Sequence, residues 1–393
     1  MKEHHRVNIL FTNASAFSVA KQIGGGEVHL LSLISKLNRE RYKIFVAYPG
    51  PGPLEELLKK ESVTPLRVTS LRGKWEPLCV FELMCLIQRH SIDIVHSYEP
   101  KSAFWAMIAA NLLDVPEKVY TVHLPCFTPY WKESGWRWAR DKIRFLRDSI
   151  TSGMADKIIA VSDEIRTEKI ERQHVAPDKV VTILNGVDST KFSPTSKDRK
   201  RLYEKFGIPE ESPLVGVVAR MEPHKGHGYL IQAMSAVIDE VPETRLLVIG
   251  EGWYEQEIRR AVQRQQLENH IIFTGFQEDM AGILAGLDIV VMPSLYESTN
   301  LSLVEAMMMG KPVVASAIPS HRHMVQDGVN GFLVKPKDTQ SLGSAMIKVL
   351  KNPSLAITMG KKGRKIAVAR FSLDRMCEET EDLYKALLSK TDI

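Results

Sequence analysis

The sequence predicts an α/β protein with two doubly wound, Rossmann-like domains that face each other across a cleft. Short β-branched apolar segments alternate with helical patterns, an order that favours parallel sheets joined by crossover helices. The series occurs twice with similar lengths, and 393 residues suffice for two hydrophobic cores. We therefore expect two domains of one design, with ligands bound beyond the carboxyl ends of their strands.

Periodicity and the flanking turn residues define the elements of each series. In the first half the expected strands are 7–11, 44–48, 92–96, 119–123, 157–161 and 180–184, with helices that include 27–37, 77–88 and 102–113. In the second half they are 214–219, 245–249, 271–274, 289–292, 313–315 and 332–334, with helices that include 226–241, 254–266, 301–309 and 339–350.

The domain boundary is expected within 188–212, where a Ser-Pro-Thr-Ser stretch precedes a charged helix and a new strand. The first domain then covers residues 1–190 and the second covers residues 191–371. The terminal segment, 372–393, contains a helix at 372–388 that we expect to pack across one or both domains.

Composition excludes several classes of protein. A net charge of +5 is too small to indicate nucleic acid, and no apolar run approaches the length of a membrane span or of a signal-peptide core. The four cysteines form no Cys-x-x-Cys pair and no His/Cys ligand cluster. These features are typical of a soluble protein of the reducing cytoplasm without structural zinc.

The most informative segment is DIVVMPSLYESTNLSLVEAMMMG, 288–310, in which an apolar strand ends at a polar turn that opens a helix. The start of a helix can bind an anion through its free N–H groups and its dipole. Glu297 lies in the turn and Glu305 in the helix, where side chains lean back toward the helix start. The segment suits a ligand with an anionic centre flanked by hydroxyl groups, such as a nucleotide sugar. A structural alternative explains the two carboxylates equally well: Glu297 would cap the helix, and Glu305 would be a solvated residue on its surface.

Two further loops carry residues suited to phosphate. Gly25 and Gly26 lie between the first strand and the first helix, where a backbone without side chains can approach a phosphate closely. A dinucleotide fingerprint is not complete, because His29 occupies its last glycine position. Arg220 and Lys225 follow a strand of the second domain and can clamp a diphosphate. A ligand-free flexible loop and a pair of solvated cations are the structural alternatives.

Other polar residues follow strands of the first domain. His123 ends the strand 119–123, where it can face the cleft and contact a sugar hydroxyl, although a purely structural histidine is equally consistent with this position. His96 has the same kind of position. Asn185, in ILNGVD, is predicted to line the cleft, and turn chemistry alone also accounts for it.

No Asp-x-Asp occurs in the chain, so no metal site is predicted; a transferase that holds its leaving diphosphate through a divalent metal normally needs clustered carboxylates.

The segment 131–147, WKESGWRWARDKIRFLR, combines six basic side chains with two acidic ones and interleaves them with aromatic and aliphatic residues. Such a helix can dock on an anionic membrane surface, whereas a solvated helix with its aromatic side chains in the core is the alternative.

Together these segments resemble the retaining glycosyltransferases of family 4, which have the GT-B fold. The resemblance runs through GGGE, TVHL, DKIIAVS, ILNGVD, ARMEPHKG, VIGEG, FTGF and YESTNLSLVEAMMMGKPVVAS in order, and so covers nearly the whole chain. It implies an acceptor-binding first domain and a donor-binding second domain. One departure is that Ser298, Thr299 and Asn300 replace the Gly or Pro common in this loop, and their side chains narrow the expected sugar pocket.

The resemblance also implies residue roles. Arg220 and Lys225 would bind the donor's diphosphate, Glu297 would contact the transferred sugar near its reacting end, and Glu305 would accept hydrogen bonds from the ribose. The other implied contacts are His123 to the sugar, Gly25 and Gly26 to the phosphate region, the backbone amides of Thr299, Asn300 and Leu301 to sugar or phosphate oxygens, and the backbone around Phe276 to the base.

The implied reaction moves a hexose from a nucleoside diphosphate to a hydroxyl acceptor with retention, for a cell-envelope polysaccharide or glycolipid. No covalent nucleophile is evident, so the resemblance implies a front-face route in which the leaving phosphate helps deprotonate the acceptor. A non-hydrolysing nucleotide-sugar epimerase of the same architecture is one alternative, and a catalytically silent sugar-binding scaffold is another. The expected location is cytoplasmic, with peripheral contact at the inner face of the cell membrane.

Overall fold

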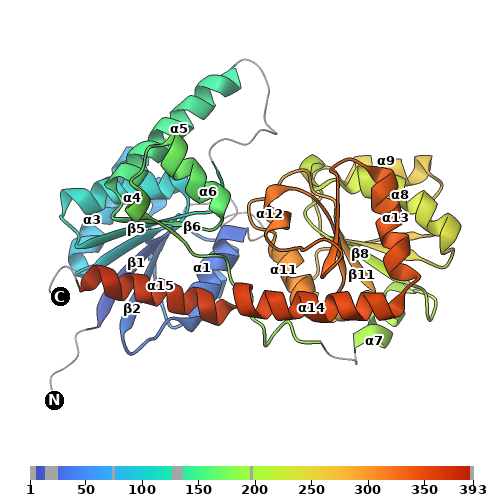
Figure 1. Ribbon diagram of the computed structural model, residues 1–393. Coiled ribbons are helices and arrows are strands. Elements are labelled where there is room, and N and C mark those ends of the chain that lie inside the picture. Colours follow the sequence, from blue (N-terminus) through green and yellow to red (C-terminus); the bar gives the residue numbers. More distant parts are fainter. Residues whose placement is uncertain (1–5, 14–24, 73–75, 126–135, 195–197, 390–393) are drawn as a thin grey trace. The chain divides into compact units, whose positions relative to one another are not determined.

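The computed structural model describes residues 6–13, 25–72, 76–125, 136–194 and 198–389. The chain divides into two compact units, which are Met1–Gly186 with Leu373–Ile393, called here the first unit, and Val187–Ser372, the second unit. Each unit is built on one parallel sheet with helices on both of its faces (Figure 1). The predicted pair of doubly wound, Rossmann-like domains is therefore confirmed.

The first unit has a seven-stranded sheet in the order β3-β2-β1-β4-β5-β6-β7. Its strands are β1 Val7–Thr12, β2 Tyr42–Tyr48, β3 Thr64–Arg67, β4 Ile94–Ser97, β5 Glu117–Val122, β6 Lys157–Ala160 and β7 Val180–Thr182. Its α-helices are α1 Gly25–Lys36, α2 Pro53–Leu58, α3 Cys79–Arg89, α4 Pro100–Leu112, α5 Trp136–Met154, α6 Asp163–Thr167 and α15 Leu373–Leu388.

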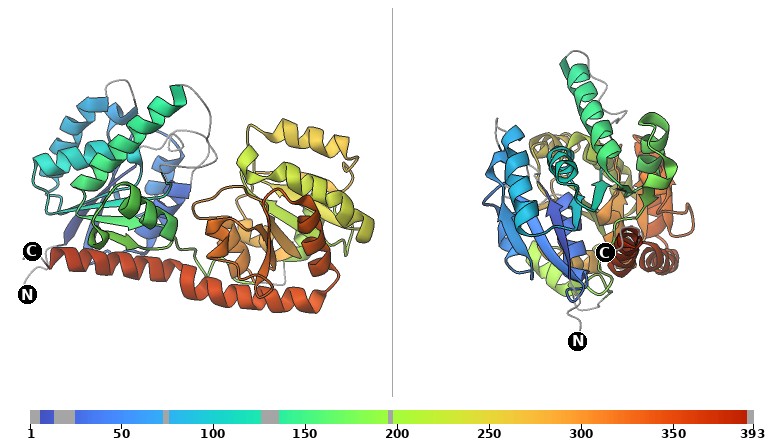
Figure 2. Two further views of the ribbon diagram at one scale, coloured as in Figure 1. Left: turned by 45° about the horizontal axis from the view of Figure 1, so that its top comes forward. Right: turned by 90° about the vertical axis from the view of Figure 1, so that its left-hand side faces the viewer.

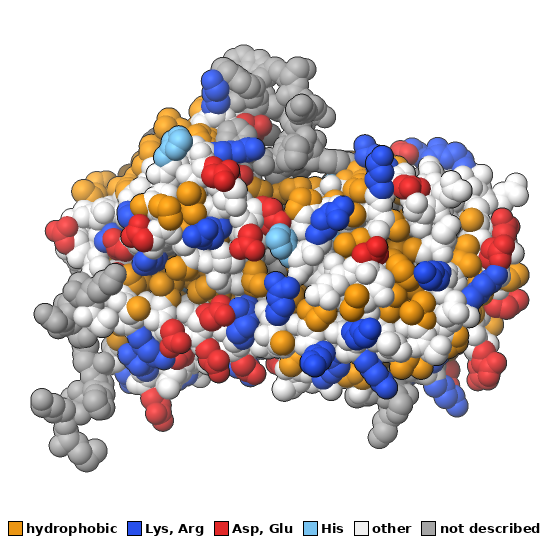
Figure 3. Space-filling view, viewed as in Figure 1, with side chains coloured by type: hydrophobic (Ala, Val, Ile, Leu, Met, Phe, Trp, Pro, Cys, Tyr) orange, Lys and Arg blue, Asp and Glu red, His pale blue; other side chains and the backbone are white. Residues whose placement is uncertain are grey.

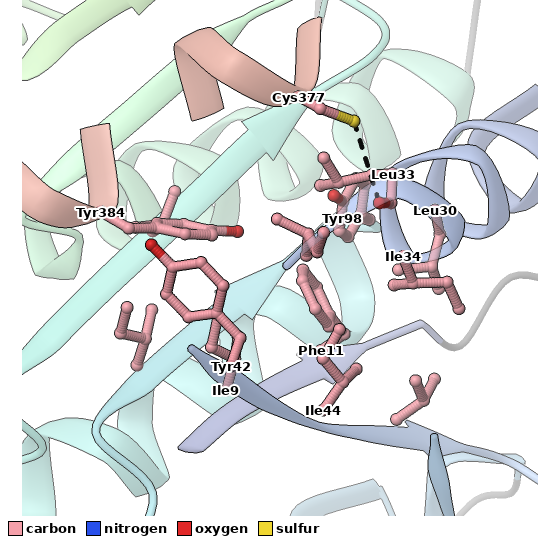
Figure 4. Close-up of a cluster of buried hydrophobic side chains, with 14 of the residues drawn as sticks. Ile9, Phe11, Leu30, Leu33, Ile34, Tyr42, Ile44, Tyr98, Cys377 and Tyr384 are labelled. Carbon is pink, nitrogen blue, oxygen red and sulfur yellow. Dashed lines mark hydrogen bonds between the residues drawn. The ribbon is translucent and has the colours of Figure 1, made fainter. Parts of the chain in front are cut away.

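Both faces of this sheet are buried, as the apolar strands require. Successive side chains of β1 point to opposite faces, so Ile9 and Phe11 join one hydrophobic cluster and Leu10 joins another. The terminal helix α15 completes the first of these clusters: Cys377 and Tyr384 point into it, and the Tyr384 ring packs edge-on against Tyr42 (Figure 4).

The second unit has a six-stranded sheet in the order β10-β9-β8-β11-β12-β13. Its strands are β8 Leu214–Val218, β9 Arg245–Ile249, β10 Ile271–Gly275, β11 Ile289–Met292, β12 Val313–Ser316 and β13 Gly331–Val334. Its α-helices are α7 Asp198–Phe206, α8 His227–Glu240, α9 Glu255–Arg264, α10 Met280–Gly286, α11 Leu301–Met308, α12 Pro319–Arg322, α13 Thr339–Leu350 and α14 Pro353–Phe371.

All the expected strands are present, within a few residues of their predicted bounds. The edge strand β3 was missed because it is short, contains a proline and is only partly buried. The helix α14 was missed because Gly360 and Gly363 lie inside it and lower its helix propensity. Gly360 is needed for packing, since a Cβ atom there would lie 1.8 Å from the carbonyl oxygen of Gly310.

Charged side chains of both signs are interspersed over the face of the protein shown in Figure 3, in keeping with the small net charge. Among the described residues, no helix combines the length and the apolar character needed to cross a membrane. The N-terminal half of α5 projects beyond the rest of the first unit (Figure 2).

Candidate functional site

The candidate site of the second unit is built where β8 and β11 end. These strands are neighbours in the sheet, with Ile289 opposite Val215, so the loops that follow them meet at one edge. The loop after β8 contains the short helix Pro223–Lys225, and the loop after β11 runs to the start of α11. The amide of Leu295 donates a hydrogen bond of 2.7 Å to the carbonyl of His224, which joins the two loops directly.

Gly226 makes this junction possible. Its φ of +75° lies in the left-handed region, which favours glycine, and a Cβ atom would lie 2.0 Å from the carbonyl oxygen of Pro293. The backbone of the first loop therefore packs directly on the backbone of the second. This contact places the side chain of Lys225 beside the loop that carries Glu297.

Lys225 and Glu297 form a close ion pair. The Lys225 ammonium donates to both carboxylate oxygens, at 2.6 and 2.8 Å, and only 15% and 9% of the two side chains are exposed. The Ser294 hydroxyl donates to the same carboxylate at 2.9 Å. Burial alone would raise the pKa of Glu297, but Lys225 and the hydrogen bond from Ser294 outweigh it and hold that pKa below its usual value. The carboxylate is therefore ionised and fixed in place.

Asn300 organises the start of α11, as the polar turn predicted. Its side-chain oxygen accepts from the amide of Leu303 at 3.1 Å and caps the helix. Its amide nitrogen lies 3.2 Å from Nε2 of His321, whose Nδ1 lies 2.9 Å from the carbonyl oxygen of Ser316. Because the carbonyl can only accept, Nδ1 of the buried, neutral His321 carries the proton and Nε2 accepts from Asn300. Asn300 is thus held from both sides.

Arg220 and its neighbours form a second polar group in the loop after β8. The Arg220 guanidinium, about half exposed, lies 2.6 Å from Glu222, and Nδ1 of His224 lies 3.4 Å from the other oxygen of that carboxylate. Burial and the nearby Lys225 lower the pKa of His224, so this imidazole is neutral near pH 7. Arg220 therefore offers a cation at the surface, whereas Lys225 offers one that is nearly buried.

Glu305 follows Asn300 by five residues, in the second turn of α11. The residue as a whole is partly exposed, but its carboxyl group is largely shielded from water. This burial raises the pKa of Glu305 to about 7, against a smaller opposing effect of Lys191. The carboxyl group is consequently close to half ionised at neutral pH. A ligand group that donates hydrogen bonds would favour the ionised form.

The remaining predicted residues of this unit lie at the same end of the sheet. Thr299 precedes Asn300, and Leu301 is the first residue of α11. Phe276 follows β10 at the sheet edge. The residue is 62% exposed, and its amide lies 3.3 Å from the carboxylate of Glu251. Phe276 is thus two strands away from the Lys225–Glu297 pair.

In the first unit, the predicted residues fall into two places. Gly25 and Gly26 begin α1, and a Cβ atom on Gly26 would lie 3.9 Å from Cδ2 of His123, which directly follows β5. Asn185 lies beyond β7, buried, with its side-chain oxygen unpaired among the described residues. Gly24, Cys126 and the segment 131–135 lie outside the described residues.

Sequence reasoning missed Glu222, His321 and Ser294 as members of the site. One feature of the sequence could have indicated His321: it follows shortly after the strand β12, which neighbours β11 in the sheet. Glu222 and Ser294 gave no signal, because their contacts depend on loop conformation. His96, a weaker candidate, is a structural residue: it is fully buried, with its ring nitrogens 2.5 Å from the Tyr384 hydroxyl and 2.7 Å from Thr121.

A carboxylate fixed by an ammonium group beside a helix start, at the carboxyl end of a parallel sheet, is an arrangement suited to a phosphorylated, hydroxyl-bearing ligand. Comparison with known sequences identifies the family. The family model described as "Glycosyltransferase Family 4" matches residues 23–191, and that described as "Glycosyl transferases group 1" matches residues 198–366. The protein is a glycosyltransferase, and its chain belongs to glycosyltransferase family 4, with the GT-B fold.

Individual relatives match over almost their whole length. The chain is 27% identical over 384 residues to the UDP-Gal:alpha-D-GlcNAc-diphosphoundecaprenol alpha-1,3-galactosyltransferase of Escherichia coli, covering 93% of this chain and 98% of that one. It is 28% identical to the putative glycosyltransferase EpsD of Bacillus subtilis, covering 88% and 90%.

Solved structures show the same fold. Anabaena HepE in complex with UDP-glucose superposes with a TM-score of 0.84 at 22% identity, covering 97% of this chain and 100% of that one. WaaG, a glycosyltransferase involved in lipopolysaccharide biosynthesis, superposes with a TM-score of 0.75 at 17% identity, covering 95% and 99%.

Proposed function

We propose that the protein transfers a hexose, with retention of anomeric configuration, from a nucleoside-diphosphate sugar to a hydroxyl acceptor in cell-envelope polysaccharide or glycolipid synthesis. The observation that carries the proposal is the Lys225–Glu297 ion pair beside the start of α11. The E. coli relative, a galactosyltransferase with a lipid-linked acceptor, supports the donor and acceptor classes.

The second unit binds the donor in this proposal. Lys225 and Arg220 hold the diphosphate, and the backbone amides of residues 299–301 hold sugar or phosphate oxygens. Glu305 accepts hydrogen bonds from the ribose, and the backbone around Phe276 contacts the base. These cations at a helix start serve the leaving group, and no step of the proposed reaction passes through a metal.

We assign each residue of the Lys225–Glu297 pair a part in the reaction. Glu297 orients the sugar near its reacting carbon. As the bond between that carbon and the diphosphate oxygen breaks, negative charge develops on the phosphate, and Lys225 stabilises it. The acceptor oxygen attacks from the same face, its proton passes to the leaving phosphate, and the anomeric configuration is retained. Glu297 is already salt-bridged, which suits a positioning group rather than a covalent nucleophile.

The first unit binds the acceptor and the sugar in this proposal. Gly25 and Gly26 line the phosphate region, and His123, which adjoins Gly26, contacts a sugar hydroxyl. Burial lowers the pKa of His123 to about 4, so it acts as a neutral hydrogen-bonding group. Asn185 lines the acceptor side.

The decisive experiment incubates the purified protein with UDP-galactose and a short-chain lipid analogue of α-GlcNAc diphosphate, and follows the products by mass spectrometry and NMR. A galactosylated lipid with an α linkage is the expected result. An epimerised nucleotide sugar formed without acceptor would establish the epimerase instead. Donor binding with no turnover on any nucleotide hexose tried would leave only a scaffold. Transfer that persists undiminished in both Glu297→Ala and Lys225→Ala would refute the site.

We also propose that α5 makes peripheral contact with an anionic membrane at the cytoplasmic face. Ile143, Leu146 and Ile150 lie three and four residues apart, on one helix face, and are 66%, 61% and 45% exposed. Lys142, Arg144 and Arg147 are interspersed with them. The opposite side is anchored, because the buried Asp148 contacts Lys169 at 2.5 Å. Apolar residues flanked by cations match an anionic lipid surface.

Sedimentation with vesicles tests this contact. The wild-type protein is expected to co-sediment with vesicles rich in anionic lipid and not with neutral ones. Binding should fall in Leu146→Ser with Ile150→Ser, and also in Arg137→Glu, Arg140→Glu and Arg144→Glu combined. Unchanged sedimentation in both variants would eliminate the contact. The matched control is Leu112→Ser, because Leu112 lies on α4, elsewhere on the unit, and is 62% exposed.

A further inference from the structure

The first unit contains three buried or half-buried imidazoles in one group of rings. The ring centroid of His29, on α1, lies 4.8 Å from that of His123, edge to face. Tyr98 stacks against His123 on one side, at 5.7 Å, and against His96 on the other, at 4.6 Å. The rings of His29, Tyr98 and His123 therefore all touch one another.

These histidines differ in hydrogen bonding. Both ring nitrogens of His96 are paired, as expected for a structural residue. Nδ1 of His29 and Nε2 of His123 have no hydrogen-bond partner among the described residues, although His29 is only 6% exposed. A buried polar atom without a partner costs free energy, which a purely structural side chain such as phenylalanine would avoid. These two nitrogens lie on rings that touch one another and are therefore available to a hydrogen-bonding ligand.

The described residues leave space beside these nitrogens. Gly25 and Gly26 lie four and three residues before His29, and hence on the same face of α1. A Cβ atom on Gly25 would meet no described atom within 4 Å, and one on Gly26 would meet only His123. Among the described residues, the face of the helix that carries His29 is thus open next to His123.

We propose that His29 is a ligand-binding residue which, with His123, forms a subsite for carbohydrate hydroxyl groups. The inference rests on the proposed transferase function and adds a residue to it. A hydroxyl both donates and accepts hydrogen bonds, and so does a neutral imidazole. Burial and the neighbouring imidazoles lower the pKa of His29 well below its usual value. A sugar hydroxyl finds two complementary nitrogens here.

Paired substitutions separate this role from a structural one. His29→Phe keeps a ring in the cluster but removes the unpaired nitrogen, so the melting temperature should stay constant or rise. Transfer should nevertheless fall about 3- to 10-fold in kcat/KM, as expected for the loss of one hydrogen bond. His29→Asn places a polar atom near the position of Nδ1 and should recover most of the activity. Tyr42→Phe, which also removes a buried hydroxyl that is unpaired among the described residues, should leave transfer unchanged.

Calorimetry with UDP-galactose then identifies which sugar is bound. Weaker donor binding in His29→Phe assigns the hydroxyls to the donor, and unchanged donor binding with a raised KM for the lipid analogue assigns them to the acceptor. Unchanged donor affinity and unchanged transfer kinetics in His29→Phe would overturn the inference. If the wild type binds UDP-galactose without transferring it, the proposed function fails, and donor affinity in the two His29 variants alone decides for or against the subsite.

Discussion

The two candidate sites differ in charge: the site of the second unit is built from ionised side chains, and that of the first unit from neutral ones. In the second unit, Lys225 and Glu297 are both ionised, salt-bridged and tightly hydrogen-bonded. In the first unit, His29, His96 and His123 are neutral, and two of their nitrogens remain unpaired among the described residues. The difference matches the two parts of a nucleotide sugar: fixed charges suit a diphosphate, and neutral donors and acceptors suit hydroxyl groups. The following predictions test that division.

The largest effect is expected from Lys225→Met. It removes the proposed stabiliser of the leaving phosphate and leaves Glu297 nearly buried without its cation. Transfer should fall at least about 100-fold, on the order of 3 kcal/mol of transition-state stabilisation. The matched control is Lys205→Met, which loses an exposed hydrogen bond to Gln277 and a cation–π contact with Phe206. Steady-state kinetics within threefold of wild type for Lys225→Met would show that the charged site is not catalytic.

Gly226→Ala tests whether the charged site depends on contact between its two loops. The added Cβ atom would collide with the Pro293 carbonyl, and the positive φ is unfavourable for alanine. We expect a loss of about 2–4 kcal/mol in the free energy of unfolding. Gly228→Ala, two residues on, meets no described atom within 4 Å and lies in the helix α8, so it should be neutral or stabilising. Equal denaturant midpoints for the two variants would contradict the packing argument.

Glu305 gives a pH signature. Its folded pKa of about 7 lies above its usual value, so ionisation of this group destabilises the ligand-free protein as the pH rises through 7. If ribose hydroxyls donate to the carboxylate, binding favours the ionised form, and UDP-galactose should bind several-fold more tightly at pH 8 than at pH 6. In Glu305→Gln this dependence should disappear. A persisting pH dependence of the dissociation constant in the variant would exclude Glu305 as its source.

The smallest effect is expected from a pair of tyrosines in the core of the first unit. Tyr384→Phe removes the hydroxyl that pairs with His96 and should cost about 1 kcal/mol in stability. Tyr42→Phe removes a hydroxyl with no partner among the described residues and should cost little or nothing. Thermal unfolding of both variants checks this prediction. A melting temperature that is lower for Tyr42→Phe than for Tyr384→Phe would contradict it.

Much of the fold could be predicted from the sequence because buried parallel strands are nearly continuous apolar runs. The 289–292 strand and the polar turn after it are examples, and the capping role of Asn300 follows from local rules. The helix α14 could not be predicted, because Gly360 is determined by a contact with Gly310, fifty residues away in the sequence. Local propensity carries no information about such a contact.

The candidate site shows the same limit. Lys225 and Glu297 were each predicted to be site residues, but not to touch one another, since their contact depends on β8 and β11 being neighbours in the sheet. His29 appeared in the sequence only as the residue that breaks a dinucleotide fingerprint. Its significance comes from its ring contact with His123 and its unpaired nitrogen, which only three-dimensional packing reveals.

Calorimetric titration of UDP in the presence of EDTA tests the central claim, that Lys225 binds the leaving diphosphate while Glu297 serves the sugar. Lys225→Met should weaken UDP binding at least tenfold, about 1.4 kcal/mol. Glu297→Gln should bind UDP as tightly as the wild type or more tightly, because Lys225 is released from its partner, and yet lose transfer. UDP affinity that is unchanged in Lys225→Met, or that falls equally in both variants, would contradict the account.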